Sequence, residues 1–261
     1  MKRGSVWAWL WIVLGVIYFF LPLLATIEFS LRARPNLVAY QNVFNDSKFL
    51  GSLFYSFGIG ILTIVVSLLI VVPTAYWVHL RLPRLRPVVE FVTLMPFVIP
   101  AVILVFGLIR IYSRQPFVLT NTEAGSNILL IGAYVVLSFP YVYRSADTGL
   151  RAIDVRTLTE AAQSLGASWP TILLRVIFPN LRVALLSGSF LTLAIVIGEF
   201  TIASFLARPA FGPYLSLLGQ NKAYEPASVS IISFGLTWGL MGIIQFLGRR
   251  TPGQVPLGGP R

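Results

Sequence analysis

The sequence predicts an all-α integral membrane protein, on the evidence of its composition and of its apolar runs. Of the 261 residues, 56% are hydrophobic and 11% are charged, whereas soluble domains carry roughly 25% charged residues. Apolar runs of about 20 residues, the length that crosses a bilayer core, recur along the chain. So few charges cannot cover the surface of a soluble globule, which argues against a soluble enzyme or binding module.

Six apolar segments are long enough to span a membrane, and the fourth is the shortest. None shows the alternation of polar and apolar residues that a barrel strand requires, so we expect six helices in one transmembrane domain over residues 1–250. The Pro- and Gly-rich residues 251–261 are expected to form a flexible cytoplasmic tail. The predicted spans are 6–31, 52–78, 88–112, 128–143, 183–206 and 228–247.

The basic residues predict the orientation of these spans. With the N-terminus inside, 13 of the 20 Lys and Arg residues lie on the cytoplasmic side, where they are normally retained. Both termini are therefore expected to be cytoplasmic. This placement also accounts for most of the net charge of +11 without a nucleic-acid partner. The first apolar run follows Lys2 and Arg3, but it is longer than the roughly 7–15 residues of a signal-peptide core, so we expect a retained helix.

The sequence offers little for metal or nucleotide chemistry. It has no cysteine and one histidine, His79, which excludes thiolate and multi-histidine metal sites. It has no G-x-x-x-x-G-K-[ST] phosphate loop, so we expect that the chain does not hydrolyse ATP itself.

The segment 144–182, between the fourth and fifth predicted spans, is long for a connecting loop and keeps helical periodicity. Thr157 and Glu160 fit a capping box at the start of a short helix, and Gly166 is expected to end it. Apolar residues at helical spacing predict one face of this helix, formed by Leu158, Ala161, Ala162 and Leu165. Ser168 and Pro170 then predict a new helix start. A helix that merely lies in the lipid headgroup layer remains an alternative.

This segment resembles the EAA loop of the permease subunits of binding-protein-dependent ATP-binding-cassette importers. The family pattern is EAA, three residues, Gly, nine residues, and then Ile-x-Leu-Pro. The chain has Glu160–Ala162, Gly166 and Pro179 at this spacing, with Val176 and Phe178 in place of the usual Ile and Leu. Both replacements exchange one apolar residue for another.

The resemblance implies the type I importer permease fold, with a cytoplasmic coupling helix between the fourth and fifth spans. It also implies two separate ATPase subunits that carry ATP and magnesium, a second permease subunit, homologous or identical, and an external solute-binding protein. The location would be a bacterial inner membrane, in contact with lipid and with no cofactor bound by this chain. The residues expected at the ATPase docking site, by this resemblance, are Glu160, Ala161, Ala162, Gly166, Leu158, Leu165 and Pro179.

Glu199 is the one acidic residue expected deep in a span, where ionisable groups are costly. With Gly198 beside it, Glu199 could line the translocation path and favour cations, or it could form a structural hydrogen bond to Ser, Thr or Tyr on a neighbouring helix. The stretch Gly198–Leu206 is similar to the fifth span of spermidine/putrescine-type permeases, whose relatives import ferric iron, thiamine and sulfate. A polyamine or a similar small solute is therefore the leading expectation for the substrate.

Pro96 and Pro100 are four residues apart in the third predicted span. Each removes a backbone hydrogen bond and favours a kink, which could serve as a gate. Glu28 lies four residues before Arg32, so an ion pair at the membrane interface is expected there.

Two other functional classes fit parts of the sequence. A secondary carrier or channel would explain the spans and Glu199 but not the EAA pattern. A membrane-embedded enzyme would need clustered His, Asp or Cys residues, which the predicted spans do not offer.

Overall fold

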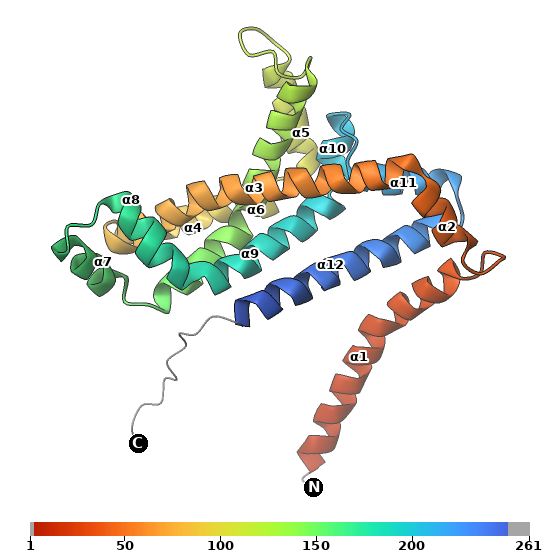
Figure 1. Cartoon of the computed structure of the whole chain (residues 1–261), viewed down its shortest axis with the longest axis horizontal. Helices are drawn as coiled ribbons and strands as arrows, with labels where there is room; N and C mark the ends of the chain where they lie inside the picture. Colours follow the sequence, from red (N-terminus) through yellow and green to blue (C-terminus); the bar gives the residue numbers. More distant parts are fainter. Residues whose placement is uncertain (1–2, 250–261) are drawn as a thin grey trace.

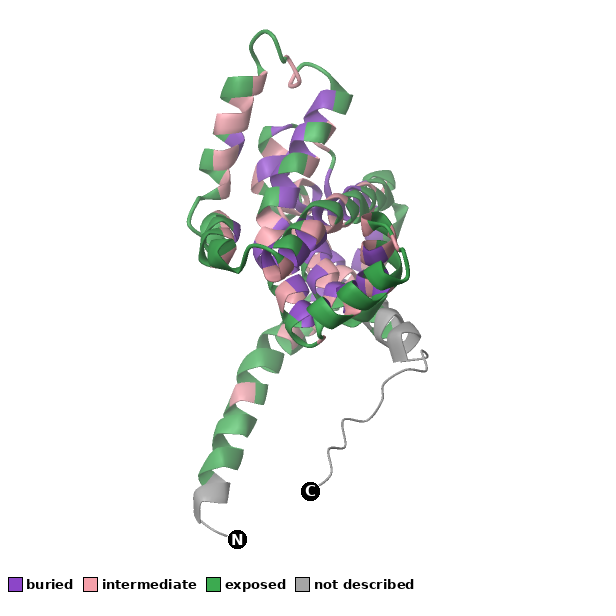
Figure 2. Ribbon diagram, turned by 90° about the vertical axis from the view of Figure 1, so that its left-hand side faces the viewer, coloured by how far each residue is buried: buried purple, intermediate pink, exposed green. Residues whose placement is uncertain are grey.

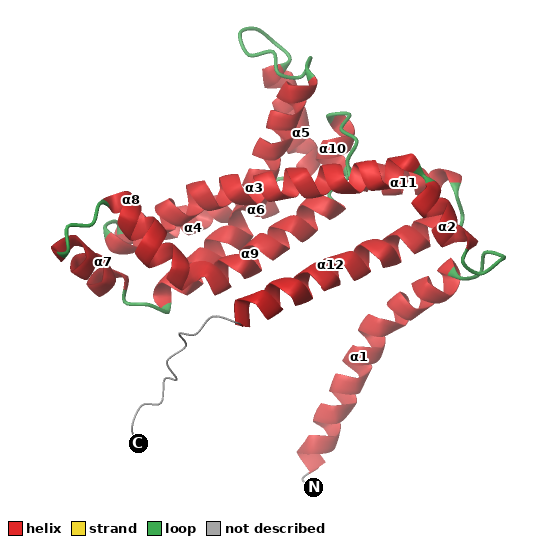
Figure 3. Cartoon of the chain, viewed as in Figure 1, coloured by secondary structure: helices red, strands yellow, loops and turns green. Residues whose placement is uncertain are grey.

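The computed structural model describes residues 3–249, with side chains placed from Trp7 to Gly239. The regular structure of these residues is entirely helical (Figure 3). In chain order the elements are α1 (Arg3–Ser30), α2 (Val38–Asn45), α3 (Ser47–Leu80), η1 (Pro83–Leu85), α4 (Arg86–Leu94), η2 (Met95–Phe97), α5 (Ala101–Tyr112), α6 (Glu123–Arg151), α7 (Val155–Ser164), α8 (Trp169–Thr171), η3 (Ile172–Ile177), α9 (Phe178–Gly198), α10 (Thr201–Phe205), α11 (Phe211–Asn221) and α12 (Glu225–Arg249).

Four stretches of helix in the described residues are long and apolar enough to cross a membrane. They are Trp7–Ser30, Ser47–Leu80, Glu123–Arg151 and Trp169–Gly198, and a sharply bent pair would make a fifth. The sixth predicted span, 228–247, falls within α12. The total of six spans therefore stays a prediction, and the predicted tail 251–261 lies outside the described residues.

The third predicted span, 88–112, is not one continuous helix. The segment Pro83–Phe97 and the helix Ala101–Tyr112 meet at 95°, which is a broken span or a re-entrant loop. Pro96 lies in the turn η2, and Pro100 precedes α5 with an extended backbone at φ −58° and ψ 138°. Neither proline can donate a backbone hydrogen bond, which favours a break between them.

The fifth predicted span, 183–206, has different limits in the structure. Its helix begins at Trp169, directly after Ser168 as the Ser-Trp-Pro pattern predicted, and continues through η3 to Gly198. There the backbone becomes extended at Glu199, with ψ 126°, and the short helix α10 follows. The predicted span thus contains a break next to its acidic residue.

The core forms where α3, α6 and α9 pack against one another (Figure 1). Small residues allow this close approach, as is common between membrane helices. A Cβ atom added at Gly60 of α3 would lie 2.6 Å from Leu193 Cδ1 of α9, and one at Gly188 of α9 would lie 2.8 Å from Ser145 Oγ of α6. We call the end of this bundle that carries α7 and α8 the inner end, after the predicted orientation, and the end with α2 and α11 the outer end.

Helix α1 lies apart from this core. Figure 2 shows it almost wholly exposed, and Figure 1 shows it diverging from α12 toward the N-terminus. Its contact with the rest of the chain lies near the outer end, where the rings of Phe29 and Tyr224 are 5.1 Å apart. Its burial therefore requires lipid or another protein.

Candidate functional site

Helix α7, in the segment that resembles the EAA loop, begins three residues earlier than the capping-box pattern predicted. Asp154 is the N-cap, and its carboxylate accepts hydrogen bonds from the Thr157 backbone N–H at 3.1 Å and the Thr157 hydroxyl at 2.7 Å. These bonds lower the pKa of Asp154. The predicted box of Thr157 and Glu160 is thus wrong, and Glu160 instead pairs with Arg156 at 2.8 Å on the exposed surface.

The predicted apolar face of α7 is divided between two sides of the helix. The buried side is formed by Val155, Thr159 and Ala162, with Leu158 half-buried beside them. Ala161 and Leu165 point outward, and Leu165 is 88% exposed. These two residues are therefore exposed within the described part of the chain.

Gly166 ends α7 as predicted, because its φ of +77° is readily adopted only by glycine. Its N–H donates to the Gln163 carbonyl at 2.9 Å, and the N–H of Ala167 donates to the Ala162 carbonyl at 3.0 Å. This pair of bonds is the Schellman motif. It turns the chain sharply from α7 toward α8.

A buried contact fastens α7 to the inner end of α3. The hydroxyls of Tyr76 and Thr159 are 2.8 Å apart, and both residues are at most 2% exposed. Thr159 donates its single proton to the Val155 carbonyl at 2.6 Å, so Tyr76 is the donor in the bond between the two hydroxyls. Sequence reasoning missed this contact, since the two residues are 83 positions apart.

Aromatic stacking supports the same junction. The rings of Trp77 on α3 and Trp169 on α8 are 4.8 Å apart, and the guanidinium carbon of Arg81 lies 6.0 Å from the Trp169 ring centroid. Both α7 and α8 are thus attached to α3.

Pro179 lies where the π-helical turn η3 passes into α9. In this turn the Phe178 N–H donates to the Leu173 carbonyl, five residues back. Pro179 has no N–H to donate, and the wider turn gives its ring room. The side-chain amide of Asn180 donates to the Val176 carbonyl at 2.7 Å. The helix therefore continues through the proline.

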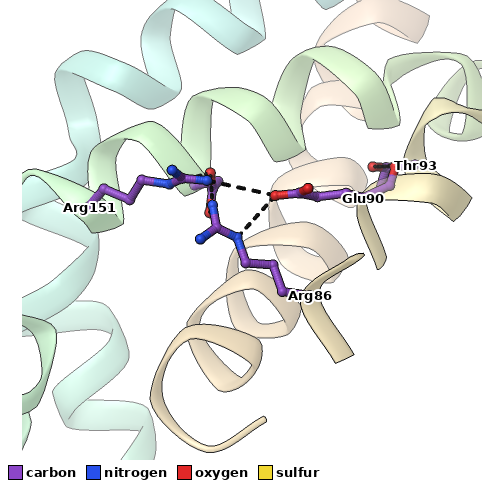
Figure 4. Close-up of polar contacts among 5 residues, drawn as sticks. Arg86, Glu90, Thr93 and Arg151 are labelled. Atoms are coloured by element: carbon purple, nitrogen blue, oxygen red, sulfur yellow. Dashed lines mark hydrogen bonds and ion pairs between the residues drawn. The ribbon is translucent and has the colours of Figure 1, made fainter. Parts of the chain in front are cut away.

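A network of four charged residues joins α4 to α6 at the inner end (Figure 4). The Arg86 guanidinium contacts Asp147 at 2.9 Å and Glu90 at 3.0 Å, and Arg151 contacts Asp147 at 2.9 Å. The network holds the inner half of the broken third span against the helix that leads into α7, and sequence reasoning did not identify it.

A cavity of about 640 Å³ lies toward the outer end, between α9, α11 and α12. These helices are neighbours in Figure 1, and Gly198 at the end of α9 lines the cavity. None of the described residues that line it carries a charge. Five aromatic residues contribute to the wall, namely Phe190, Phe200, Phe211, Phe234 and Trp238.

Glu199 lies beside this cavity, but its carboxylate is bound elsewhere. It accepts hydrogen bonds from the Tyr134 hydroxyl at 3.0 Å and from the backbone N–H groups of Ile202 and Ala203 at 2.8 and 3.2 Å. These hydrogen bonds stabilise the backbone where α9 ends and α10 begins. They correspond to the second role expected for Glu199, a structural hydrogen bond to a neighbouring helix. A role in the path stays a prediction.

Gly212 of α11 packs directly on this break. A Cβ atom at Gly212 would overlap the carbonyl oxygen of Glu199, so α11 reaches its place only because the residue is glycine.

Pro96 and Pro100 do not line the cavity, and their gating role also stays a prediction. At the outer end Glu28 and Arg32 form the expected pair at 2.9 Å. Within the described residues no three His, Asp or Glu side chains gather as metal ligands would.

Several curated proteins are similar to this chain. A probable molybdenum ABC transporter permease of Haloferax volcanii is 30% identical over 188 residues, which cover 68% of this chain and 67% of the relative. A spermidine/putrescine transport system permease of Haemophilus influenzae is 24% identical over 215 residues, or 81% of each protein. A probable sulfate permease of Prototheca wickerhamii is 36% identical over 112 residues, 41% of this chain and less than half of the relative, at 44%.

A solved structure supports the fold. The crystal structure of a bacterial ABC transporter involved in the import of the acidic polysaccharide alginate contains a chain that matches with a TM-score of 0.71. The match covers 96% of this chain and 98% of that one at 14% identity, and it therefore shows the fold alone. Residues 72–250 match the model of a family described as the binding-protein-dependent transport system inner membrane component. The match covers more than half of the sequence, and the chain therefore belongs to this family of ABC transporter permeases.

Proposed function

We propose that the chain is the permease subunit of an ATP-driven, binding-protein-dependent importer and forms half of its translocation pathway. The observation that carries this proposal is the exposed side of α7. Its small residue Ala161 and its exposed Leu165 have no partner within the described chain, while its other side is fixed to α3 through Tyr76 and Thr159. An anchored helix that exposes a small residue and a large apolar one, Ala161 and Leu165, suits docking on another subunit.

The proposed assembly contains two ABC ATPase subunits, which bind ATP and magnesium. It also contains a second permease, which is homologous or a second copy, and an external solute-binding protein. The chain itself binds no cofactor. It crosses a bacterial inner membrane six times with both termini in the cytoplasm.

In this assembly α7 is the coupling helix. It lies in a cleft of the ATPase and moves when ATP closes the nucleotide dimer. Glu160 and Ala161 lie on its exposed side, and Gly166 permits the sharp turn that follows. ATP closure would draw the inner ends together and open the outer side to the docked binding protein.

The test of docking is a charge placed on α7. Leu165→Asp should greatly reduce copurification of the ATPase without changing membrane insertion, since the side chain packs on nothing described. The matched control is Leu37→Asp, which places the same charge on an exposed leucine, 58% accessible, at the outer end. ATPase recovery that is equal in both variants would refute the docking surface. Uptake into vesicles that continues without ATP would instead favour a secondary carrier or channel.

For the substrate, we propose a polyamine or a similar small solute. The support is the similarity of Gly198–Leu206 to the spermidine/putrescine permeases and the length over which such a relative matches. Other relatives are named for sulfate and molybdenum. Uptake by the reconstituted importer, measured with labelled spermidine, sulfate and molybdate, distinguishes these substrates.

A further inference from the structure

We infer that the cavity between α9, α11 and α12 is a binding site for organic cations that carry N–H groups, such as alkylammonium ions, and that it excludes oxyanions. This inference rests on the proposed function, because it assigns a solute class to a site on the same pathway. Four properties of the cavity favour a cation. The first turn of α11 also lines the cavity, but it offers few donors to an anion, because the Phe211 N–H donates to Ser56 Oγ at 2.8 Å and Pro213 has no N–H.

Aromatic faces are available to a solute in this cavity. Phe200, Phe234 and Trp238 are 47%, 44% and 62% exposed, and the Phe234 and Trp238 rings are 5.6 Å apart at a tilt of 35°. The face of an aromatic ring carries partial negative charge and attracts cations. It repels sulfate and similar anions for the same reason.

The hydroxyl groups that line the cavity on α12 have already used their protons. Ser233 donates to the Ser230 carbonyl at 3.1 Å, and Thr237 donates to the Ser233 carbonyl at 2.8 Å. A hydroxyl has one proton, so both oxygens can offer only lone pairs to a solute. Such acceptors suit an ammonium group, whereas an oxyanion requires donors.

The carboxyl end of α9 forms another part of the wall. Ala194 and Gly198 line the cavity in the last turn of the helix, which ends where the backbone becomes extended. The last carbonyl groups of a helix lack intrahelical partners and carry the negative end of its dipole. Helix ends of this kind, within a broken span, are used by transporters to hold cations.

The charged side chains at and near the cavity also favour a cation. No described lining residue is basic, and Glu199 lies between the lining residues Gly198 and Phe200 with its carboxylate turned toward α10. A cation in the cavity would therefore be attracted without forming a direct ion pair with Glu199. Weak binding of this kind is what a conducting pathway requires, because the solute must also leave.

The experiment uses the full-length chain in lipid nanodiscs and equilibrium dialysis with labelled spermidine. We expect spermidine to bind, putrescine to displace it, and sulfate to have no effect beyond that of ionic strength. Trp238→Leu should weaken binding about tenfold, whereas Trp238→Phe, which keeps an aromatic face, should change it about twofold or less. The matched control is Trp9→Leu on α1, where the tryptophan is 61% exposed and lies outside the cavity; this variant should bind like the unchanged chain.

A second variant places a positive charge on the wall. Ser216 lines the cavity on α11, and Ser216→Lys should abolish spermidine binding. Absence of amine binding, specific binding of sulfate or molybdate, or an unchanged affinity in Trp238→Leu would each overturn the inference. ATP-driven uptake of a different class of solute would remove this inference and leave the importer function intact. Failure to associate with an ATPase would remove the importer function and leave measured amine binding unaffected.

Discussion

Replacing Tyr76 by phenylalanine removes one hydroxyl from the buried contact between α3 and α7. The Thr159 oxygen then loses the donor at 2.8 Å, but its own proton remains bonded to Val155. A hydrogen bond of this kind contributes about 1 kcal/mol to folding. Tyr76→Phe should therefore destabilise the chain by about 1 kcal/mol.

Thr159→Val acts on the same bond from the other side and should cost more. It leaves the hydroxyl of Tyr76, a residue only 1% exposed, without an acceptor. An unsatisfied buried polar group costs about 1–3 kcal/mol. The double variant removes both partners, so its cost should fall short of the sum of the single costs by about 1 kcal/mol.

The assay is reversible unfolding of the full-length chain in lipid nanodiscs, combined with hydrogen exchange of α7. Tyr18→Phe is the control, since that hydroxyl belongs to a residue that is 75% exposed on α1. Two results would refute the assignment of this contact as the attachment of α7. One is that the unfolding free-energy costs of the two single variants simply add in the double variant; the other is that the α7 amides exchange no faster in Thr159→Val.

Four further results are expected. Gly212→Ala should destabilise the chain by about 1–3 kcal/mol through overlap with the backbone between α9 and α10, whereas Gly219→Ala, in open space on the same helix, should not; equal unfolding curves would contradict this. Asp147→Asn should cost about 1–2 kcal/mol because two arginines lose their shared partner, as thermal unfolding would measure. Ala207→Gly should stabilise the chain by about 0.5–1 kcal/mol, since the alanine has φ +53°; a lower midpoint would count against it. Because the pKa of Asp154 is lowered in the folded state, its contribution to stability should be complete above about pH 5 and lost as the pH falls through the lowered value; the α7 amides should then show smaller protection factors, that is, exchange rates corrected for the intrinsic effect of pH.

Local rules predicted several features of the fold correctly. Gly166 ends a helix because the position requires a positive φ, and a new helix starts after Ser168. The prolines at 96 and 100 produce a break because neither can donate a backbone hydrogen bond. In each case a few neighbouring residues determine the backbone.

The start of α7 shows where local rules were insufficient. Asp154 and Thr157 are both good N-cap residues three positions apart, so the sequence allowed either start. The helix begins at Asp154 because Val155 and Thr159 are then placed on the side that packs against the rest of the inner end. That choice depends on Tyr76, whose position relative to α7 no local pattern reveals.

The network of Arg86, Glu90, Asp147 and Arg151 was missed for a related reason. Two of its pairs follow the i,i+4 rule and could have been noticed, namely Arg86 with Glu90 and Asp147 with Arg151. Their combination depends on the 95° bend, which brings α4 against α6. The size of that bend, and with it the neighbours of Glu90, could not be read from the kink expected at the prolines.

The helix from Trp169 to Gly198 connects the inner surface with the cavity. It contains 30 residues, which corresponds to a length of about 45 Å. Its first residue stacks on α3 beside α7, and its last lines the cavity. The stretch Trp169–Gly198 is helical throughout, including the π-helical turn before Pro179. A displacement of α7 would therefore reach the cavity wall along this helix as well as through side-chain packing. At Glu199 this helix breaks. The Glu199 carboxylate, which also accepts a hydrogen bond from Tyr134, binds the backbone N–H groups of Ile202 and Ala203 in α10, and α10 packs on α5 and α6.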